Sequence, residues 1–142
     1  MAQADNLDCV PLQDEHIYVA VPDSWEIPLE DGRISLDSLL DRPMLYLANP
    51  KNAGVLVMQN KPLQSKVMVS SDGDTILSMI QAEMGFSLLS RRFSADCPEG
   101  VSMYPADPPI TRTIGVAALS QRELSPLTRR FVRMLREDDV LN

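Results

Sequence analysis

The sequence predicts an α/β fold, because short apolar strands alternate along the chain with helices that begin at recognisable capping residues. Two segments carry most of this prediction. Residues 71–90 contain a capped helix that stops at a glycine and leads into a short apolar strand, and residues 111–137 contain a strand, a polar turn and another capped helix. This alternation implies a largely parallel sheet flanked by helices.

Composition sets the first limits on the class of protein. With 142 residues, 44% of them hydrophobic, the chain can form one compact core and is too short for two independent ones. It has no apolar run of about 18 residues, and residues 1–5 lack the basic and apolar blocks of a signal peptide. We therefore expect a cytoplasmic protein without membrane contact.

The charge balance argues against nucleic acid as a direct partner. Twenty acidic and thirteen basic residues give a net charge of −7, which opposes binding of a phosphate polyanion. The basic residues are uneven, because Arg129, Arg130, Arg133 and Arg136 fall in one C-terminal segment. Such a cluster could bind nucleic acid or an acidic partner, but a solvated helix face is the simpler interpretation.

The residues that bind metals or act as nucleophiles are few. Cys9 and Cys97 fit no zinc-ligand spacing, and His16 is the one histidine of the chain. Without a signal peptide, both cysteines are expected to be reduced thiols. His16 opens an apolar run, which indicates a strand end rather than a catalytic base. We expect no metal, no cofactor and no enzymatic activity.

The first strand is predicted at residues 16–21, where β-branched and aromatic residues precede a proline. Ser35 is expected to cap a short helix through residue 40, whose leucines share one face. A second strand is predicted at residues 43–48, before a polar loop that begins at Asn49. A strand that ends in such a loop before a helix is typical of the edge of a ligand-binding crevice.

The middle of the chain contains the clearest helix. A weak helix is predicted at residues 53–60 and a strand at residues 66–70. Asp72 or Asp74 is expected to cap the next helix. Gly85 is expected to end it in a left-handed conformation. The apolar stripe of this helix follows i, i+3, i+4, i+8 spacing and comprises Ile76, Met79, Ile80 and Met84.

The last third of the chain should begin with a strand at residues 86–89. Residues 91–109 are rich in proline and are predicted as a loop, with room for one short strand at residues 101–104. A clear strand follows at residues 113–118. Ser125, followed by a proline, is a strong start for the last helix. Its predicted buried stripe comprises Leu127, Phe131, Met134 and Leu135.

Several of these segments occur in an order and spacing that resemble a known family. They are a strand ending in Val21-Pro22, the segment Ile34–Leu39, the strand Pro43–Leu47, the helix Asp74–Ile80 leading to Met84–Leu89, and the closing Leu124–Leu135. Together they resemble the C-terminal effector-binding domain of LysR-type transcriptional regulators, from about His16 to Glu137. The resemblance implies a periplasmic-binding-protein-like (type 2) subdomain with a mixed, largely parallel sheet flanked by helices.

The resemblance also implies a domain organisation. Residues 1–142 would be a partial effector-binding domain, without the winged helix-turn-helix, the linker helix and the first βαβ portion that family members carry. Residues 1–21 and 111–142 would belong to the first subdomain, and residues 22–110 to the second. Intact family members are oligomers, so a homo-oligomer is expected, with apolar surface left by the missing portion pairing with another copy.

The function implied by the resemblance is ligand sensing. A small metabolite would bind between two subdomains, and the change of shape would reach a DNA-binding domain absent from this chain. The candidate ligand-binding residues are Asn49, Lys51, Ser70, Ser71 and Thr75, because hydroxyls and free backbone N–H groups at a helix N-terminus can hold a carboxylate.

Two other interpretations stay open at this point. The serines and Thr75 could simply cap the helix, and Asp72 and Asp74 would repel an anion, so a neutral or amphipathic effector fits as well as a dicarboxylate. The chain could also be a free-standing small-molecule or solute-binding α/β module without transcriptional output. A hydrolase that uses Ser71 or Ser90 is disfavoured, because neither lies in a Gly-x-Ser-x-Gly turn.

Overall fold

The computed structural model describes residues 7–48, 58, 61–69 and 72–137. The chain divides into two compact units, one formed by Met1–Glu15 with Thr111–Asn142 and the other by His16–Ile110. The predicted α/β class, with a mixed sheet and flanking helices, is confirmed.

The main sheet has the strand order β2-β3-β7-β1-β6. β1 and β6 are antiparallel, with Ile17 opposite Ser90, whereas β3 and β7 are parallel, with Ile34 opposite Ala106. β1 and β7 are long enough to contribute residues to both units. The bounds of the five strands are β1 Asp8–Pro22, β2 Leu29–Glu30, β3 Arg33–Ser35, β6 Ser87–Ser90 and β7 Val101–Ala118.

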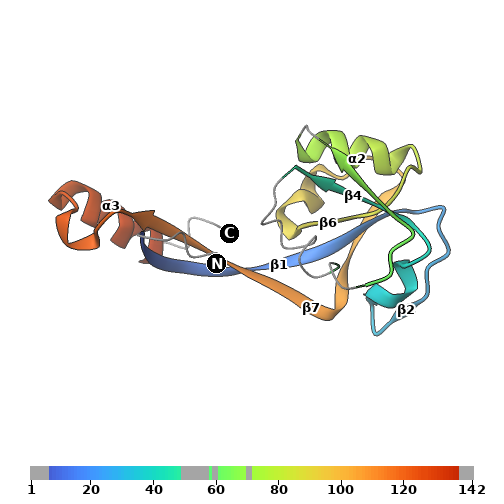
Figure 1. Cartoon of the computed structure of the whole chain (residues 1–142), viewed down its shortest axis with the longest axis horizontal. Coiled ribbons are helices and arrows are strands. Elements are labelled where there is room, and N and C mark those ends of the chain that lie inside the picture. Colours follow the sequence, from blue (N-terminus) through green and yellow to red (C-terminus); the bar gives the residue numbers. More distant parts are fainter. Residues whose placement is uncertain (1–6, 49–57, 59–60, 70–71, 138–142) are drawn as a thin grey trace. The chain divides into compact units, whose positions relative to one another are not determined.

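A parallel pair, β4 (Pro43–Leu47) and β5 (Ser65–Val69), lies beside β6. The junction is made by Phe86, whose N–H donates to the Pro43 carbonyl at 3.0 Å and whose carbonyl accepts from the Leu45 N–H at 2.8 Å. Helix α2 (Gly73–Gln81) covers one face of β4 and β6 (Figure 1).

The core of the His16–Ile110 unit lies on both faces of the sheet. Val19 belongs to one buried cluster and its neighbour Ala20 to the other, as expected when successive strand residues point to opposite faces. Met44 and Leu45 divide between the clusters in the same way. One cluster contains Phe86, and the other contains Ile76 and Ile80 from α2. Burial on both faces is the usual condition of strands in α/β proteins.

The other unit contains the start of β1, the end of β7, the short 3-10 helix η3 (Gln121–Glu123) and helix α3 (Pro126–Glu137). The Thr113 hydroxyl donates to the Asp14 carboxylate at 2.7 Å, and Arg112 pairs with Glu15. The predicted cap of the last helix is confirmed, because the Thr128 N–H donates to Ser125 Oγ at 3.2 Å.

Two strand predictions were wrong in extent. β1 begins at Asp8, so His16 is an exposed residue inside the strand rather than its first residue. The predicted loop over residues 91–109 ends early, because β7 starts at Val101 and continues through three prolines to Ala118. β3 pairs with β7 at Ala106 and Asp107, and neither is a proline. The prolines of β7 therefore remove no backbone N–H from the hydrogen bonds between β3 and β7.

The helix predictions needed three corrections, at Ser35, at Gly85 and at Met84. Ser35 precedes a 3-10 helix, η1 (Leu36–Leu39), and makes no side-chain capping bond. The left-handed residue after α2 is Glu83, with φ 62°, instead of Gly85. α2 ends at Gln81, so Met84 is not part of the helix, and its side chain is exposed. Leu77, which was not in the predicted stripe, is buried. The predicted helix at residues 53–60 lies outside the described residues, apart from the helical and buried Met58.

The buried stripe predicted for α3 was also wrong. Leu127, Phe131 and Met134 are exposed, Leu135 is half-buried, and Val132 is the buried residue of this helix. The helix therefore packs on the described part of its own unit through a narrow face and leaves its broad apolar face open.

Candidate functional site

The candidate site lies at the carboxyl edge of β4, β5 and β6. β4 and β5 run parallel in register, from Pro43 opposite Ser65 to Leu47 opposite Val69. A parallel bridge between Met44 and Phe86 continues this direction into β6. All three strands therefore end at one edge, which is where open α/β sheets bind their ligands.

Helix α2 begins at the same edge, and its first turn is held by Asp72. One carboxylate oxygen, Asp72 Oδ1, accepts from the Thr75 N–H at 3.0 Å and from the Thr75 hydroxyl at 3.1 Å. The backbone N–H bond, followed by the hydroxyl bond, lowers the pKa of the exposed Asp72 carboxyl below its usual 3.8. The first turn thus carries a fixed negative charge, which disfavours a dianion here.

The Asp72 cap should make stability depend on acid pH. Its pKa is lower in the folded chain than in the unfolded chain, so the cap contributes fully above the unfolded value of 3.8 and is lost as pH falls through the folded value. At neutral pH we expect Asp72→Ala to lower the free energy of unfolding, and this deficit to shrink below pH 3.8. Urea titrations at neutral pH and below pH 3.8 measure the free energy of unfolding of both proteins. An equal deficit at the two pH values would contradict a stabilising role of the ionised Asp72 carboxylate.

Two side chains that follow β6 complete this edge. The 3-10 helix η2 (Arg91–Asp96) starts at the buried Ser90, whose hydroxyl accepts from the Arg92 N–H at 3.4 Å. The Phe93 ring lies against the first turn of α2, because a methyl group built on Gly73 would come within 2.7 Å of Phe93 Cζ. The exposed Arg92 guanidinium lies 5.7 Å from the centre of that ring.

The structure places one of the five predicted ligand-binding residues. Asn49, Lys51, Ser70 and Ser71 lie outside the described residues, so their assignment stays a prediction. Thr75 lies in the first turn of α2, but its hydroxyl proton is used by Asp72. Thr75 can therefore accept a hydrogen bond from a ligand without disturbing the cap, but it cannot donate one.

The sequence analysis missed Arg92 and Phe93. The local signal was a predicted strand at residues 86–89 followed by basic and aromatic residues. Their relevance depends on β6 running alongside β4 in the same direction, which places its carboxyl end beside those of β4 and β5. That pairing is a long-range contact and has no local sequence signal.

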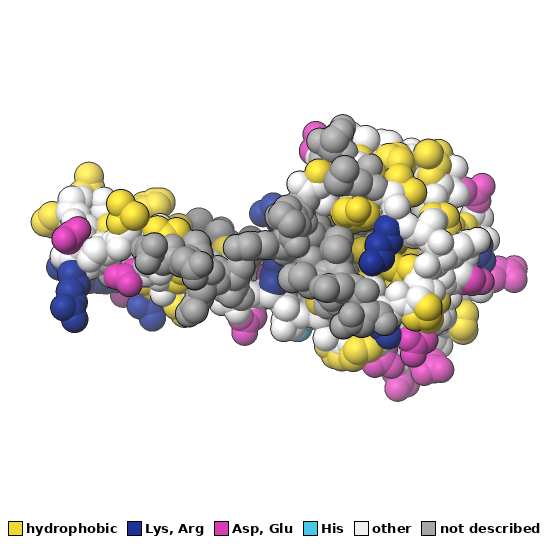
Figure 2. Space-filling model, in the orientation of Figure 1, with side chains coloured by type: hydrophobic (Ala, Val, Ile, Leu, Met, Phe, Trp, Pro, Cys, Tyr) yellow, Lys and Arg dark blue, Asp and Glu magenta, His cyan; other side chains and the backbone are white. Residues whose placement is uncertain are grey.

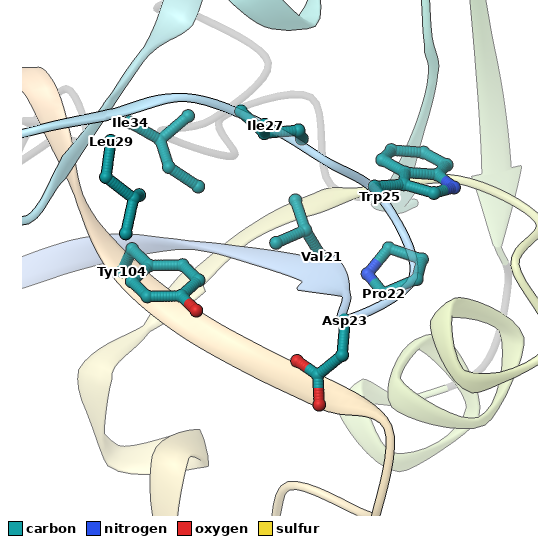
Figure 3. A pocket seen from close by; sticks show the side chains of 8 residues that line it. All are labelled: Val21, Pro22, Asp23, Trp25, Ile27, Leu29, Ile34 and Tyr104. Carbon is teal, nitrogen blue, oxygen red and sulfur yellow. The ribbon is translucent and has the colours of Figure 1, made fainter.

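A hollow elsewhere in the His16–Ile110 unit, beside Trp25, is too small for a metabolite. Trp25 and Pro22 lie at one end, Leu29, Ile34 and Tyr104 at the other, and Val21 between them (Figure 3). Its volume is about 50 Å³, whereas small-molecule pockets usually exceed about 300 Å³. The Arg42 guanidinium lies 4.5 Å from the Trp25 ring centre, which favours a structural role for this tryptophan.

The described residues contain no cluster of three or more metal-ligating side chains, and none of their helices is long and apolar enough to cross a bilayer. Burial, followed by the negative charges of Asp23 and Asp96, raises the pKa of the Cys97 thiol above its usual 9.0. A nucleophilic cysteine requires the opposite shift. Cys97 is therefore a protonated, unreactive thiol at neutral pH.

Comparison with known proteins identifies the family of this chain. The family model described as the LysR substrate binding domain matches residues 2–139. The chain belongs to the LysR substrate-binding domain family. This is a non-enzymatic regulatory family, so the expectation of no catalytic activity and the resemblance seen in the sequence are both confirmed. A comparison with curated protein sequences found no match.

Three solved structures show the same fold at low sequence identity. A putative LysR family transcriptional regulator from Pseudomonas aeruginosa is 21% identical with a TM-score of 0.77, over 99% of this chain and 51% of that one. The regulatory domain of CcmR from Synechocystis PCC6803, in complex with 2-PG, is 20% identical with a TM-score of 0.74, over 92% and 65%. The BenM effector-binding domain with its effector benzoate is 19% identical with a TM-score of 0.75, over 99% and 67%.

These likenesses establish the fold. They also show how much of each solved protein this chain covers. The LysR chain described here spans about half the length of the Pseudomonas regulator and about two thirds of the excised BenM domain. It matches only the C-terminal halves of full-length LysR regulators.

Proposed function

We propose that this chain senses a small molecule and passes the resulting change of shape to a DNA-binding domain carried outside these 142 residues. The family match over residues 2–139 is the observation that carries the proposal. A ligand that binds one arrangement of the domain more tightly than another shifts the population toward it, and no bond needs to be made or broken.

The proposal includes a domain division. Residues 22–110 would form the second subdomain, and residues 1–21 with 111–142 would belong to the first. The separation of contacts into a His16–Ile110 unit and a unit of both chain ends supports this division. The sensor would act in the cytoplasm as a homo-oligomer.

For the ligand, we favour a small carboxylate with one negative charge and an apolar body. The exposed Arg92 offers a cation, and the Phe93 ring beside it offers an apolar surface. Asp72 and Asp74, in contrast, oppose a second negative charge at the start of α2. Asn49, Lys51, Ser70 and Ser71 are proposed as further polar contacts of the carboxylate. Thr75, whose hydroxyl can only accept, would contact a donor group on a ligand that carries one. Benzoate, the effector of BenM, has this chemistry.

A thermal-shift comparison of benzoate, benzamide and phthalate tests this proposal. Benzoate should stabilise the chain, by about 2.7 kcal/mol at a hundred times its dissociation constant. Benzamide should stabilise the chain less, because it lacks the negative charge. Phthalate should also stabilise it less, because it adds a second negative charge near Asp72.

Substitution of Arg92 tests whether this residue binds the carboxylate of the ligand. Arg92→Ala should weaken benzoate binding by about tenfold or more, because it removes a charge-assisted hydrogen bond. The matched control is Arg122→Ala, which removes an exposed arginine from the other unit and should leave the shift unchanged. Equal benzoate shifts for Arg92→Ala and the unaltered chain would refute the assignment of Arg92, and no shift with any ligand would refute the ligand class.

A further inference from the structure

Arg129, Arg133 and Arg136 form a basic side on helix α3. They follow i, i+4, i+7 spacing, so their side chains share one side of the helix. All three residues are exposed, and none of them joins an ion pair within the part of the chain that the structure describes. Arginine clusters of this kind attract anions.

The three arginines surround a hollow rather than a flat surface. The hollow has a volume of about 250 Å³, and Val10, Leu124 and Val132 form its apolar wall. The Arg129 guanidinium donates to the carbonyl of Arg122, which holds it at the rim. Small-molecule pockets usually begin at about 300 Å³, so this hollow has the size for a compact ligand.

The apolar side of α3 is a different surface. Arg136 follows Leu127 by nine positions, about two and a half turns, so the two side chains lie on opposite sides of the helix. Basic and apolar side chains gather on different sides of the α3 segment (Figure 2). The portion of the first subdomain outside this chain would cover the exposed apolar side, and a polypeptide seated there leaves the hollow open.

We propose that this hollow binds a phosphate monoester that carries a short apolar group. A phosphate monoester has nearly two negative charges at neutral pH and three oxygens that accept hydrogen bonds. The guanidinium fork of arginine matches phosphate oxygens. Arg133 and Arg136 can both offer it, because neither has a hydrogen-bond or ion-pair partner among the described residues.

The lining of the hollow favours a doubly charged ligand. None of the described residues around it is a carboxylate, whereas the first turn of α2 carries Asp72 and disfavours a dianion. The valine and leucine wall favours an apolar substituent on the phosphate, because burial removes apolar surface from water. The hollow lies in the unit formed by both chain ends, so this ligand is a second one, distinct from the carboxylate proposed for the other unit.

Isothermal titration calorimetry with phenyl phosphate, near neutral pH and at physiological ionic strength, tests the proposal. The unaltered chain should bind one phenyl phosphate. Arg133→Ala and Arg136→Ala should each weaken binding by about tenfold or more, because each removes a charge-assisted hydrogen bond. The matched control is Arg130→Ala, which removes the same charge from the same helix but does not line the hollow. It should change the affinity by less than about threefold, because salt screens a charge outside the site.

Two further variants separate charge from shape. Arg133→Lys keeps the positive charge but loses the planar fork, so it should recover only part of the affinity lost in Arg133→Ala. Val10→Phe fills the hollow without changing a charge and should also weaken binding. Inorganic phosphate should bind the unaltered chain more weakly than phenyl phosphate, because it cannot contact the apolar wall.

Circular dichroism should show unchanged helix content in the alanine variants, because alanine favours a helix at least as strongly as arginine does. The absence of binding heat at two temperatures, or equal affinities of the unaltered chain, Arg133→Ala and Arg136→Ala, would refute the site. An equal loss in Arg130→Ala and Arg133→Ala would show general attraction to a basic helix and would also refute it. Binding of an oligonucleotide without binding of phenyl phosphate would assign the arginines to nucleic acid instead.

This site and the carboxylate edge can fail independently. Benzoate binding should be retained in Arg133→Ala, and phenyl phosphate binding in Arg92→Ala, because the two arginines lie in different units. Loss of both ligands in either variant would show that they share one site, and it would contradict the separate hollow.

Discussion

Replacing Phe86 by alanine should destabilise the His16–Ile110 unit more than any other substitution considered. Its side chain is fully buried in the cluster that contains Val19, Ile34 and Met44. Removing a buried aromatic ring leaves a cavity and costs about 3–5 kcal/mol. Urea denaturation monitored by tryptophan fluorescence of Trp25 measures this loss.

The matched control is Leu29→Ala, which shortens a side chain that is nearly half exposed. It should lower the free energy of unfolding by less than about 1 kcal/mol. If Phe86→Ala cost no more than Leu29→Ala, the Phe86 ring would not be buried in the cluster that contains Met44, and the packing of the start of β6 against β4 would be contradicted.

Gly85→Ala should be the second most damaging change. A methyl group at this position would lie 2.6 Å from the Pro43 carbonyl oxygen and 3.1 Å from Leu45 Cγ. The carbonyl belongs to the backbone of β4 and accepts the Phe86 N–H, so it cannot move without breaking the junction. We expect a cost of about 1–3 kcal/mol, as for other overpacked sites.

The neighbouring Met84→Ala is the control for Gly85→Ala, because Met84 is exposed and its side chain is not needed for the junction. Its free energy of unfolding should change by less than about 0.5 kcal/mol. A stability of Gly85→Ala equal to that of Met84→Ala would show that β4 and β6 are farther apart than the structure places them.

Local sequence signals predicted the elements around the site well. The apolar run at residues 43–48 corresponds to β4, the run at residues 66–70 to β5, and the Asp72 cap to the start of α2. These features depend on neighbours in the sequence, through capping and apolar periodicity. The family resemblance was carried by the same local features in order, which is why it could be recognised without a structure.

The errors arose where long-range contacts decide the outcome. Gly85 was predicted from a local rule for helix ends, but it is required by the close approach of Pro43. The apolar stripe of α3 was identified correctly as a pattern, but periodicity does not reveal which surface covers it. Arg92 and Phe93 gained a role only through the pairing of β6 with β4.

Two-dimensional NMR of the isotope-labelled chain during a benzoate titration tests the proposed sensing edge most directly. Amide signals of Gly73, Thr75 and Phe93, at the carboxyl edge and the start of α2, should move with increasing benzoate, while those of Gly32 and Gly100 in distant turns should not. Saturable shifts confined to residues outside this edge, or no shifts at all, would contradict the assignment of ligand binding to the edge formed by β4, β5 and β6.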